Sequence, residues 1–150
     1  MKIKSRKDIL FQFLTFGLSS FFITIILFQV FLEKWDNSLI IVYIIMIMTI
    51  GLLFWIYFET EYELTNSELL YKSGPIKGKI NIEEITEIIK NKTLWSGLKP
   101  ATSRNGLILK YRKYEEIYIS PETNDIFINK ILEINKSIKI TEFNSNQITA

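Results

Sequence analysis

Two uncharged stretches decide the fold of this chain: residues 9–32, ILFQFLTFGLSSFFITIILFQVFL, and residues 38–58, SLIIVYIIMIMTIGLLFWIYF. A helix needs about 20 mostly apolar residues to cross roughly 30 Å of hydrocarbon, and both stretches reach that length. A buried core helix is the competing interpretation. Helices of soluble proteins, however, normally carry a polar stripe at the helical repeat. The sequence therefore predicts two membrane-spanning helices.

A cleaved signal peptide is a second alternative for residues 9–32. Such a peptide has a shorter apolar core followed by a small-residue cleavage site, and no A-x-A pattern follows this stretch. We therefore expect an uncleaved anchor. The polar residues within the two stretches are neutral, and their hydroxyls can bond back to the helix backbone. They are Gln12, Thr15, Ser19, Ser20, Thr24, Gln29 and Thr49.

The short link at residues 33–37, EKWDN, predicts an antiparallel hairpin. Trp35 at one boundary, with Trp55 and Tyr57 at the other, is typical of an interfacial aromatic belt. Lysine and arginine are concentrated before the first stretch, and the link carries only one lysine. By the positive-inside rule the N-terminus lies in the cytoplasm, and two crossings return the chain to that side. The cations before the first stretch are Lys2, Lys4, Arg6 and Lys7.

Composition excludes several classes of function. The 150 residues are 48% hydrophobic with a mean hydropathy of +0.18, and the apolar excess lies before Glu59. The chain has no cysteine and no histidine, so no thiolate, histidine base or imidazole metal ligand is available, and no cofactor is expected. A net charge of +2 does not indicate nucleic-acid binding. Richness in Ile, Asn and Lys is typical of an AT-rich bacterial genome. Together with the two predicted spans and their orientation, we expect a protein of the bacterial cytoplasmic membrane.

From Glu61 onward, short apolar runs alternate with turn residues, which indicates strands. Ile85, Glu87 and Ile89 are expected on one face of their strand, and Leu107, Leu109 and Tyr111 on one face of theirs. A loop is expected at residues 93–105. The predicted strands cover residues 61–65, 69–73, 79–82, 85–92, 106–112 and 116–119.

Ser120-Pro121-Glu122 predicts a helix start, with serine as N-cap and proline at the first helical position. The helix is expected to run to about Asn135. Antiparallel strands closed by one C-terminal helix make an α+β module. The expected division is a basic N-terminus at 1–8, a transmembrane hairpin at 9–58 (9–32 and 38–58), a domain at 59–140 and a flexible tail at 141–150.

The region from Thr60 to Asn135 resembles the bacterial pleckstrin-homology-like (PH-like) domain family typified by the sublancin immunity protein. The resemblance rests on the order and spacing of seven short motifs. It implies a curved antiparallel sheet capped by a C-terminal helix, placed after N-terminal membrane helices. The motifs are YELT at 62–65, ELL at 68–70, SGP at 73–75 with KI at 79–80, IEEI at 82–85, ATSR at 101–104, LILKY at 107–111 and ISP at 119–121 before a helix with Phe127.

The candidate binding surface is residues 90–113, which contain seven cations and no acid. A basic loop held near the inner leaflet could contact anionic headgroups, at about 1 kcal/mol for each well-placed cation. The alternative is a set of solvated strand and loop positions, with Trp95 packed as core and Arg104 bracing loop carbonyls. The acid pairs at 83–84 and 115–116 make no dyad, because neighbours on a strand face opposite sides. The candidate residues are Lys90, Lys92, Trp95, Lys99, Arg104, Lys110 and Arg112.

Three functions follow from these patterns. The first is a non-catalytic, membrane-anchored PH-like module that binds a protein partner or lipid headgroups at the inner membrane face. The second, implied by the resemblance, is immunity against a bacteriocin-type peptide. An uncharacterised enzyme ranks third. Two helices enclose no transport pathway and carry no intramembrane charge, but a homo-oligomer could build one, and the oligomeric state stays open.

Overall fold

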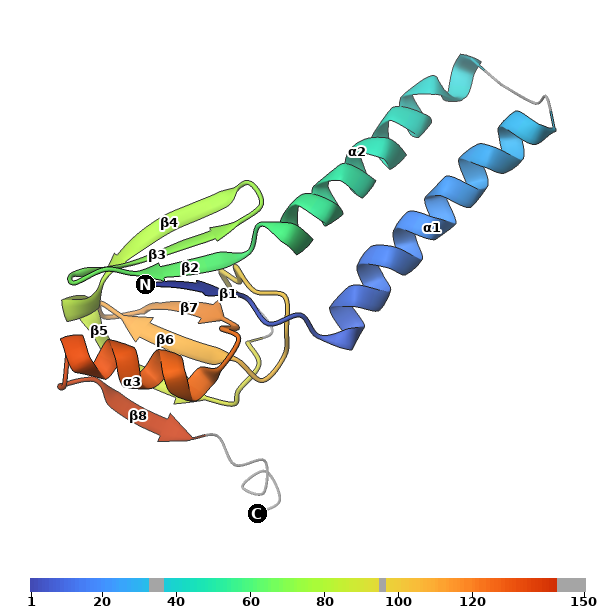
Figure 1. Ribbon diagram of the computed structural model, residues 1–150. Helices are drawn as coiled ribbons and strands as arrows, with labels where there is room; N and C mark the ends of the chain where they lie inside the picture. Colours follow the sequence, from blue (N-terminus) through green and yellow to red (C-terminus); the bar gives the residue numbers. More distant parts are fainter. Residues whose placement is uncertain (33–36, 95–96, 143–150) are drawn as a thin grey trace.

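In the computed structural model, two long helices project from one end of a domain made of two β-sheets and a helix (Figure 1). The structure describes residues 1–32, 37–94 and 97–142. Residues 33–36 of the predicted link, which include Lys34 and Trp35, lie outside these residues, and so does Trp95. The expected α+β architecture, two apolar helices followed by antiparallel strands and a C-terminal helix, is confirmed.

The two helices form an antiparallel hairpin. Helix α1 spans Ile9–Phe31, and α2 spans Ile40–Phe58 after a 3₁₀ turn at Asn37–Leu39. Both are long and apolar enough to cross a membrane, yet only 11% of the most apolar 18-residue window of each is buried. Large apolar side chains such as Phe13 and Ile41 are 78% and 68% exposed. A core helix of a soluble protein would bury such side chains, and in this structure they are exposed.

Three threonine hydroxyls within the hairpin bond back to the helix backbone as expected, whereas the buried Ser19 hydroxyl has no hydrogen-bond partner among the described residues. Thr15, Thr24 and Thr49 each donate to the carbonyl four residues earlier, at 2.8–2.9 Å. Thr15 and Ser19 are buried, and they lie on one side of α1 four residues apart. Aromatic contacts join the helices at the base of the hairpin. Among them, the rings of Phe11 and Tyr57 lie parallel with centroids 6.4 Å apart.

The first sheet contains a strand that the sequence pattern did not indicate. Strand β1, Lys2–Lys4, precedes the hairpin and pairs antiparallel with β2, Glu61–Leu64, which follows it. The sheet continues through β3, Glu68–Ser73, and β4, Ile76–Asn81. The hairpin is therefore inserted between two neighbouring strands of one sheet (Figure 1).

The second sheet has the order β7-β6-β5-β8. Its antiparallel strands are β5, Ile85–Lys90, β6, Leu107–Tyr111, and β7, Glu115–Ile119, and β8, Lys139–Glu142, lies parallel to β5. The prediction of one face for Ile85, Glu87 and Ile89 is wrong. A register shift between Ile85 and Glu87 turns the strand, so that Ile85 and Ile88 are the buried pair. The strand also ends at Lys90 rather than at residue 92.

Strand β8 was not predicted. It includes Thr141, at the position where a flexible tail was expected to begin. Residues 143–150 lie outside the described part of the chain.

The core lies between the two sheets and is closed by α3, Asn124–Ile134. Phe127 and Ile131 of this helix are fully buried against both sheets. The predicted helix start is wrong, since Thr123 is the N-cap residue and no side chain caps the helix. Ser120 lies outside the helix because its buried hydroxyl is engaged in a tertiary network.

That network consists of hydroxyls from four distant segments, namely Ser5, Tyr62, Thr102 and Ser120. The Tyr62 hydroxyl donates to the Pro100 carbonyl at 2.6 Å and accepts from the Ser120 amide at 3.0 Å. The hydroxyl oxygens of Ser5 and Ser120 lie 2.8 Å apart, and those of Thr102 and Ser5 lie 2.9 Å apart. The segment after β1 is thereby joined to β2, to the 91–106 loop and to the end of β7. Burial raises the pKa of Tyr62 and keeps its hydroxyl protonated.

Candidate functional site

The predicted basic surface is divided between two ends of the domain. Lys110 and Arg112 lie at the end of β6 that points away from the hairpin (Figure 1). Lys110 pairs with Glu87 at 2.9 Å, and Arg112 pairs with Glu84 at 2.9 Å and with Glu115 at 3.3 Å. These cations connect neighbouring segments of the second sheet, and they do not share a surface with the loop cations.

The carboxyl of Glu87 shows how fully these charges are engaged. It accepts a hydrogen bond from the Thr141 hydroxyl at 2.6 Å and another from Lys110. These two bonds lower the pKa of Glu87 below its ordinary value. Lys90, at the other end of β5, pairs with Asp125 in the first turn of α3 at 2.7 Å, and this bond raises the pKa of Lys90. Lys90, Lys110 and Arg112 are therefore each engaged in an ion pair within the domain.

Lys92, Lys99 and Arg104 all belong to the loop at residues 91–106, and Lys99 and Arg104 line a common hollow. This loop runs beside the first turn of α1 at the base of the hairpin (Figure 1). It is fastened to the sheet through Leu98, which forms a parallel bridge with Ile117 of β7. The Tyr118 hydroxyl also donates to the Ser103 carbonyl and accepts from the Gly106 amide.

A brace on this loop was expected from Arg104, but the loop carbonyls are held by Arg6. The Nη2 of Arg6 donates to the carbonyls of Arg104 and Asn105 at 2.7 and 3.1 Å. The Nε of Arg104 donates to the Asp8 carboxylate at 2.6 Å. This bond lowers the pKa of Asp8 below its ordinary value. In the sequence, Arg6 predicted only the membrane orientation. Its contact with this loop could not be predicted, because the two segments are almost a hundred residues apart in the sequence.

The substitution Asp8→Asn tests the ion pair between Asp8 and Arg104. The variant keeps the shape of the side chain and removes the charge opposite Arg104. Because the Arg104 side chain is 55% exposed, we expect the free energy of unfolding at pH 7 to fall by no more than about 1 kcal/mol. The folded-state pKa of Asp8 lies below its ordinary value of 3.8. The contribution is therefore present above about pH 4 and is lost as the pH falls through the folded-state pKa.

Melting temperatures of both proteins in detergent at pH 7 and pH 3 measure this effect. The difference should be present at pH 7 and shrink at pH 3. Glu122→Gln is the matched control, because no ion pair is found for Glu122 among the residues described. A difference between the wild-type protein and the Asp8→Asn variant that is the same at both pH values would contradict the assignment.

A hollow of about 270 Å³, which we call the junction pocket, lies between the first turn of α1 and the 91–106 loop. Its walls are mostly apolar, with Leu10 and Phe11 on the helix side and Leu94 and Ala101 on the loop side. Three lining residues are charged, namely Asp8, Lys99 and Arg104. The lining is Asp8, Leu10, Phe11, Thr93, Leu94, Lys99, Ala101, Thr102, Ser103, Arg104 and Tyr118.

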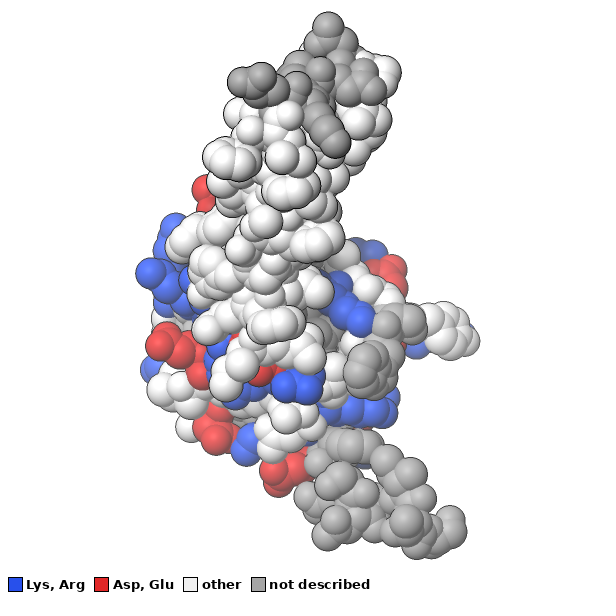
Figure 2. All heavy atoms as spheres, turned by 90° about the vertical axis from the view of Figure 1, so that its right-hand side faces the viewer, with Lys and Arg blue, Asp and Glu red and all other residues white. Residues whose placement is uncertain are grey.

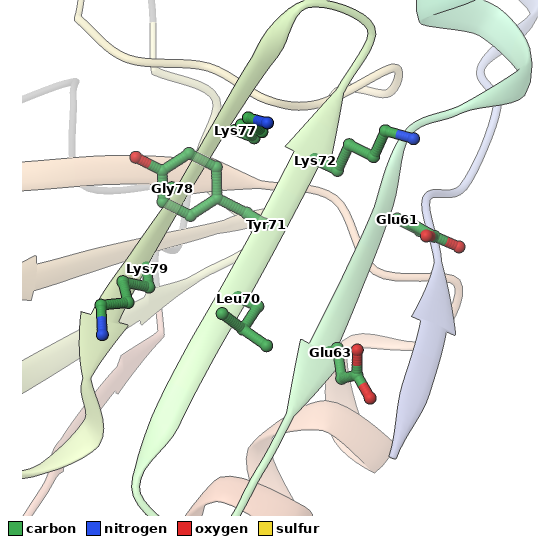
Figure 3. A pocket seen from close by; sticks show the side chains of 8 residues that line it. All are labelled: Glu61, Glu63, Leu70, Tyr71, Lys72, Lys77, Gly78 and Lys79. Carbon is green, nitrogen blue, oxygen red and sulfur yellow. The ribbon is translucent and has the colours of Figure 1, made fainter.

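A second hollow, of about 360 Å³, lies on the outer face of the first sheet (Figure 3). Its side chains form cross-strand rows, one of which runs from Glu63 through Leu70 to Lys79. Lys72 pairs with Glu59, and Lys79 pairs with Glu68. Lysines on an exposed strand such as β4 discourage pairing with other chains. We therefore interpret this hollow as a solvated sheet face.

No group of three or more potential metal ligands from His, Cys, Asp and Glu occurs in the described part of the chain. The chemistry available at the junction pocket is that of cations beside apolar walls. Such a surface suits recognition of an amphipathic anion.

Two sheets closed by a C-terminal helix, with two apolar helices at one end, define a PH-like α+β domain. The comparison with known proteins agrees, since the sequence profile described as Bacterial PH domain matches residues 60–135. The chain belongs to the bacterial PH domain family. The particular resemblance to the sublancin immunity protein stays a prediction.

A curated relative from Bacillus subtilis (strain 168), named "Uncharacterized protein YyaB", is 33% identical over 101 residues. The match covers 67% of this chain and 69% of that protein. No solved structure matches the chain. The matched family region begins at residue 60, so β1 and Arg6 lie outside it although both take part in the domain.

Proposed function

We propose that this protein is a membrane-anchored, non-catalytic recognition module that binds a protein partner or lipid headgroups at the inner face of the bacterial cytoplasmic membrane. The pairing of β1 with β2 across the inserted hairpin carries the proposal. Because these strands are neighbours in one sheet, both ends of the hairpin lie on the same side of any membrane that it crosses. This argument is independent of the positive-inside rule.

Helix lengths support the anchoring. At 1.5 Å per residue, the 23 residues of α1 and the 19 of α2 extend about 34 and 28 Å, close to the roughly 30 Å of bilayer hydrocarbon. Figure 2 shows an uncharged hairpin surface whose base is flanked by Lys and Arg side chains of the domain, with Asp and Glu side chains among them. Cations at this level would face the headgroups of the adjacent leaflet.

The domain is held directly against the base of the hairpin. Helix α2 ends at Phe58 and β2 begins at Glu61, so no linker separates them. The β3–β4 turn also contacts α2, since a Cβ atom on Gly74 would lie 2.8 Å from Cγ1 of Ile56. Because the domain is held at the base of the hairpin, the 91–106 loop lies next to the membrane surface.

The composition and the site support a non-catalytic role. Histidine and cysteine are absent from the chain. The carboxylates of Asp8, Glu84 and Glu87 are engaged in ion pairs. None of these three is therefore poised as a general base, which needs a proton acceptor free to face a substrate.

Single-cysteine labelling tests the anchoring, because the natural chain has no cysteine to interfere. Variants Lys4→Cys and Lys139→Cys should react with a membrane-impermeant maleimide only after the inner face is opened. Ser38→Cys, at the far end of the hairpin, should react in intact cells. Labelling of residues 4 and 139 from opposite sides would contradict the paired strands, and an inaccessible Ser38→Cys would contradict the crossing.

Reversing the charge at Lys99 tests the recognition surface. Lys99→Glu should weaken association with the inner-face ligand, and Lys113→Glu, at the far end of the domain, should not. Arg104 is unsuited to this test, since its loss would also remove the brace to Asp8. Equal association of both variants would direct the search to another surface.

A further inference from the structure

The junction pocket joins an apolar wall to a charged rim. Leu10 and Phe11 in the first turn of α1 form one wall, and the helix continues outward with exposed apolar side chains. An apolar chain lying along α1 could therefore enter the pocket without crossing water. The hydrophobic effect favours that arrangement, because it covers exposed apolar surface on both the chain and the pocket.

The charges around the pocket favour an anion. The Asp8 carboxylate is paired with Nε of Arg104. The ammonium of Lys99 has no carboxylate within ion-pair distance among the residues described, and the two terminal nitrogens of Arg104 have no hydrogen-bond partner among them. A phosphate at the rim would meet these two side chains, and arginine and lysine are the ordinary partners of phosphate.

The polar groups inside the pocket are already engaged. The Thr102 hydroxyl donates to the Arg6 carbonyl at 2.8 Å, and the Ser103 hydroxyl accepts from Nε of Arg6 at 3.0 Å. The Tyr118 hydroxyl is bonded to Ser103 and Gly106. An extended peptide pairs its backbone with free hydrogen-bonding groups, and these three hydroxyls are already bonded within the protein. An acyl chain needs none.

We propose that the junction pocket binds one anionic phospholipid of the adjacent leaflet, with its phosphate between Lys99 and Arg104 and part of an acyl chain against Phe11, Leu94 and Ala101. The inference rests on the proposed function and adds the site and the ligand. At about 270 Å³, the pocket is slightly smaller than the roughly 300 Å³ at which ligand pockets begin. It therefore takes part of a lipid whose remainder stays in the bilayer.

The test uses the full chain in detergent, exposed to equal amounts of phosphatidylglycerol and phosphatidylcholine, with retained lipid counted by native mass spectrometry. We expect wild-type protein to retain one phosphatidylglycerol in preference to phosphatidylcholine. Lys99→Gln should lower this preference about five-fold, the effect of one well-placed cation near a membrane surface. Lys113→Gln, a cation at the opposite end of the domain, is the matched control.

Ala101→Leu tests the apolar part by filling the pocket. It should reduce retention of both lipids, whereas Lys99→Gln should change only the preference between them. A melting temperature measured for each variant shows whether it is folded. If Ala101→Leu fails to fold, Lys99→Gln, which alters only a side chain at the rim, still tests the proposal. Inorganic phosphate at millimolar concentration should not displace the lipid.

Three results would overturn the proposal. They are no headgroup preference in the wild type, an equal loss in Lys99→Gln and Lys113→Gln, and displacement by inorganic phosphate, which would indicate a small-anion site. Extraction of cell membranes with alkaline carbonate separates this failure from failure of the proposed function. A protein that remains in the membrane without lipid preference contradicts only the pocket, and a protein released by carbonate contradicts the anchoring itself.

Discussion

Replacing Ile3 with Asp is expected to unfold the first sheet, although Ile3 lies outside the family-matched region at residues 60–135. Ile3 is buried opposite Tyr62 in the β1–β2 pair. The change loses about 1.5–3 kcal/mol of side-chain burial. A carboxylate forced into that site without a partner costs several kcal/mol more. The sum approaches the whole stability of a typical domain, about 5–15 kcal/mol.

Amide hydrogen exchange across β2 measures this effect directly. Wild-type β2 amides should be protected and those of Ile3→Asp should exchange rapidly. Lys4→Gln is the matched control, because Lys4 lies on the exposed face of the same strand. It should leave the protection unchanged. Protected β2 amides in Ile3→Asp would mean that β1 does not belong to the sheet.

A disulfide offers a second measure of the same pairing. Lys2 and Glu63 are Cα partners in the β1–β2 register. Paired residues on antiparallel strands lie about 4.5–5.5 Å apart, within the range that a disulfide spans. The double variant Lys2→Cys, Glu63→Cys should therefore cross-link on oxidation. Lys2→Cys with Glu68→Cys, which are not partners, should not.

Removing the Tyr62 hydroxyl is expected to have the second largest effect. Tyr62→Phe keeps the ring in the core but leaves the Pro100 carbonyl and the Ser120 amide without this partner. A buried polar group left unsatisfied costs about 1–3 kcal/mol. The loss should loosen the 91–106 loop in particular, because Tyr62 connects it to β2.

Melting temperature and exchange of the loop amides together test this prediction. The matched control is Tyr114→Phe, since Tyr114 is 86% exposed in the turn after β6. That variant should melt like the wild type. A Tyr62→Phe protein that also melts like the wild type would mean that water replaces the hydroxyl, and that the network does not stabilise the loop.

The hairpin and most of the strands could be predicted from the sequence. Helices α1 and α2 follow from two long uncharged stretches, and β2, β3, β6 and β7 follow from alternation of apolar and polar residues. These signals are local, because the spacing of apolar residues along a segment indicates which of its faces is buried. Errors arose where local signals compete with distant contacts. Ser120-Pro121 has the composition of a helix start, but the hydroxyl of Ser120 bonds to Ser5 and to the Thr102 amide.

The candidate site could be predicted only in part. The sequence indicated a basic segment, and Lys99 and Arg104 do lie beside the hairpin. It could not show that Lys90, Lys110 and Arg112 are ion-paired, because their partners Asp125, Glu87 and Glu84 come from other elements. It also gave Arg6 no part in the loop, since the carbonyls that Arg6 binds are distant in sequence.

The sequence by itself determined that this protein has two helices able to span a membrane and a following α+β domain. Hydrophobic length and periodicity are properties of each segment alone, so they can be read without a fold. Only the tertiary structure decided that residues 2–4 complete the sheet and that the hairpin is inserted between two paired strands. A three-residue strand carries no periodic signal, and its stability comes from the partner that the folded chain brings beside it.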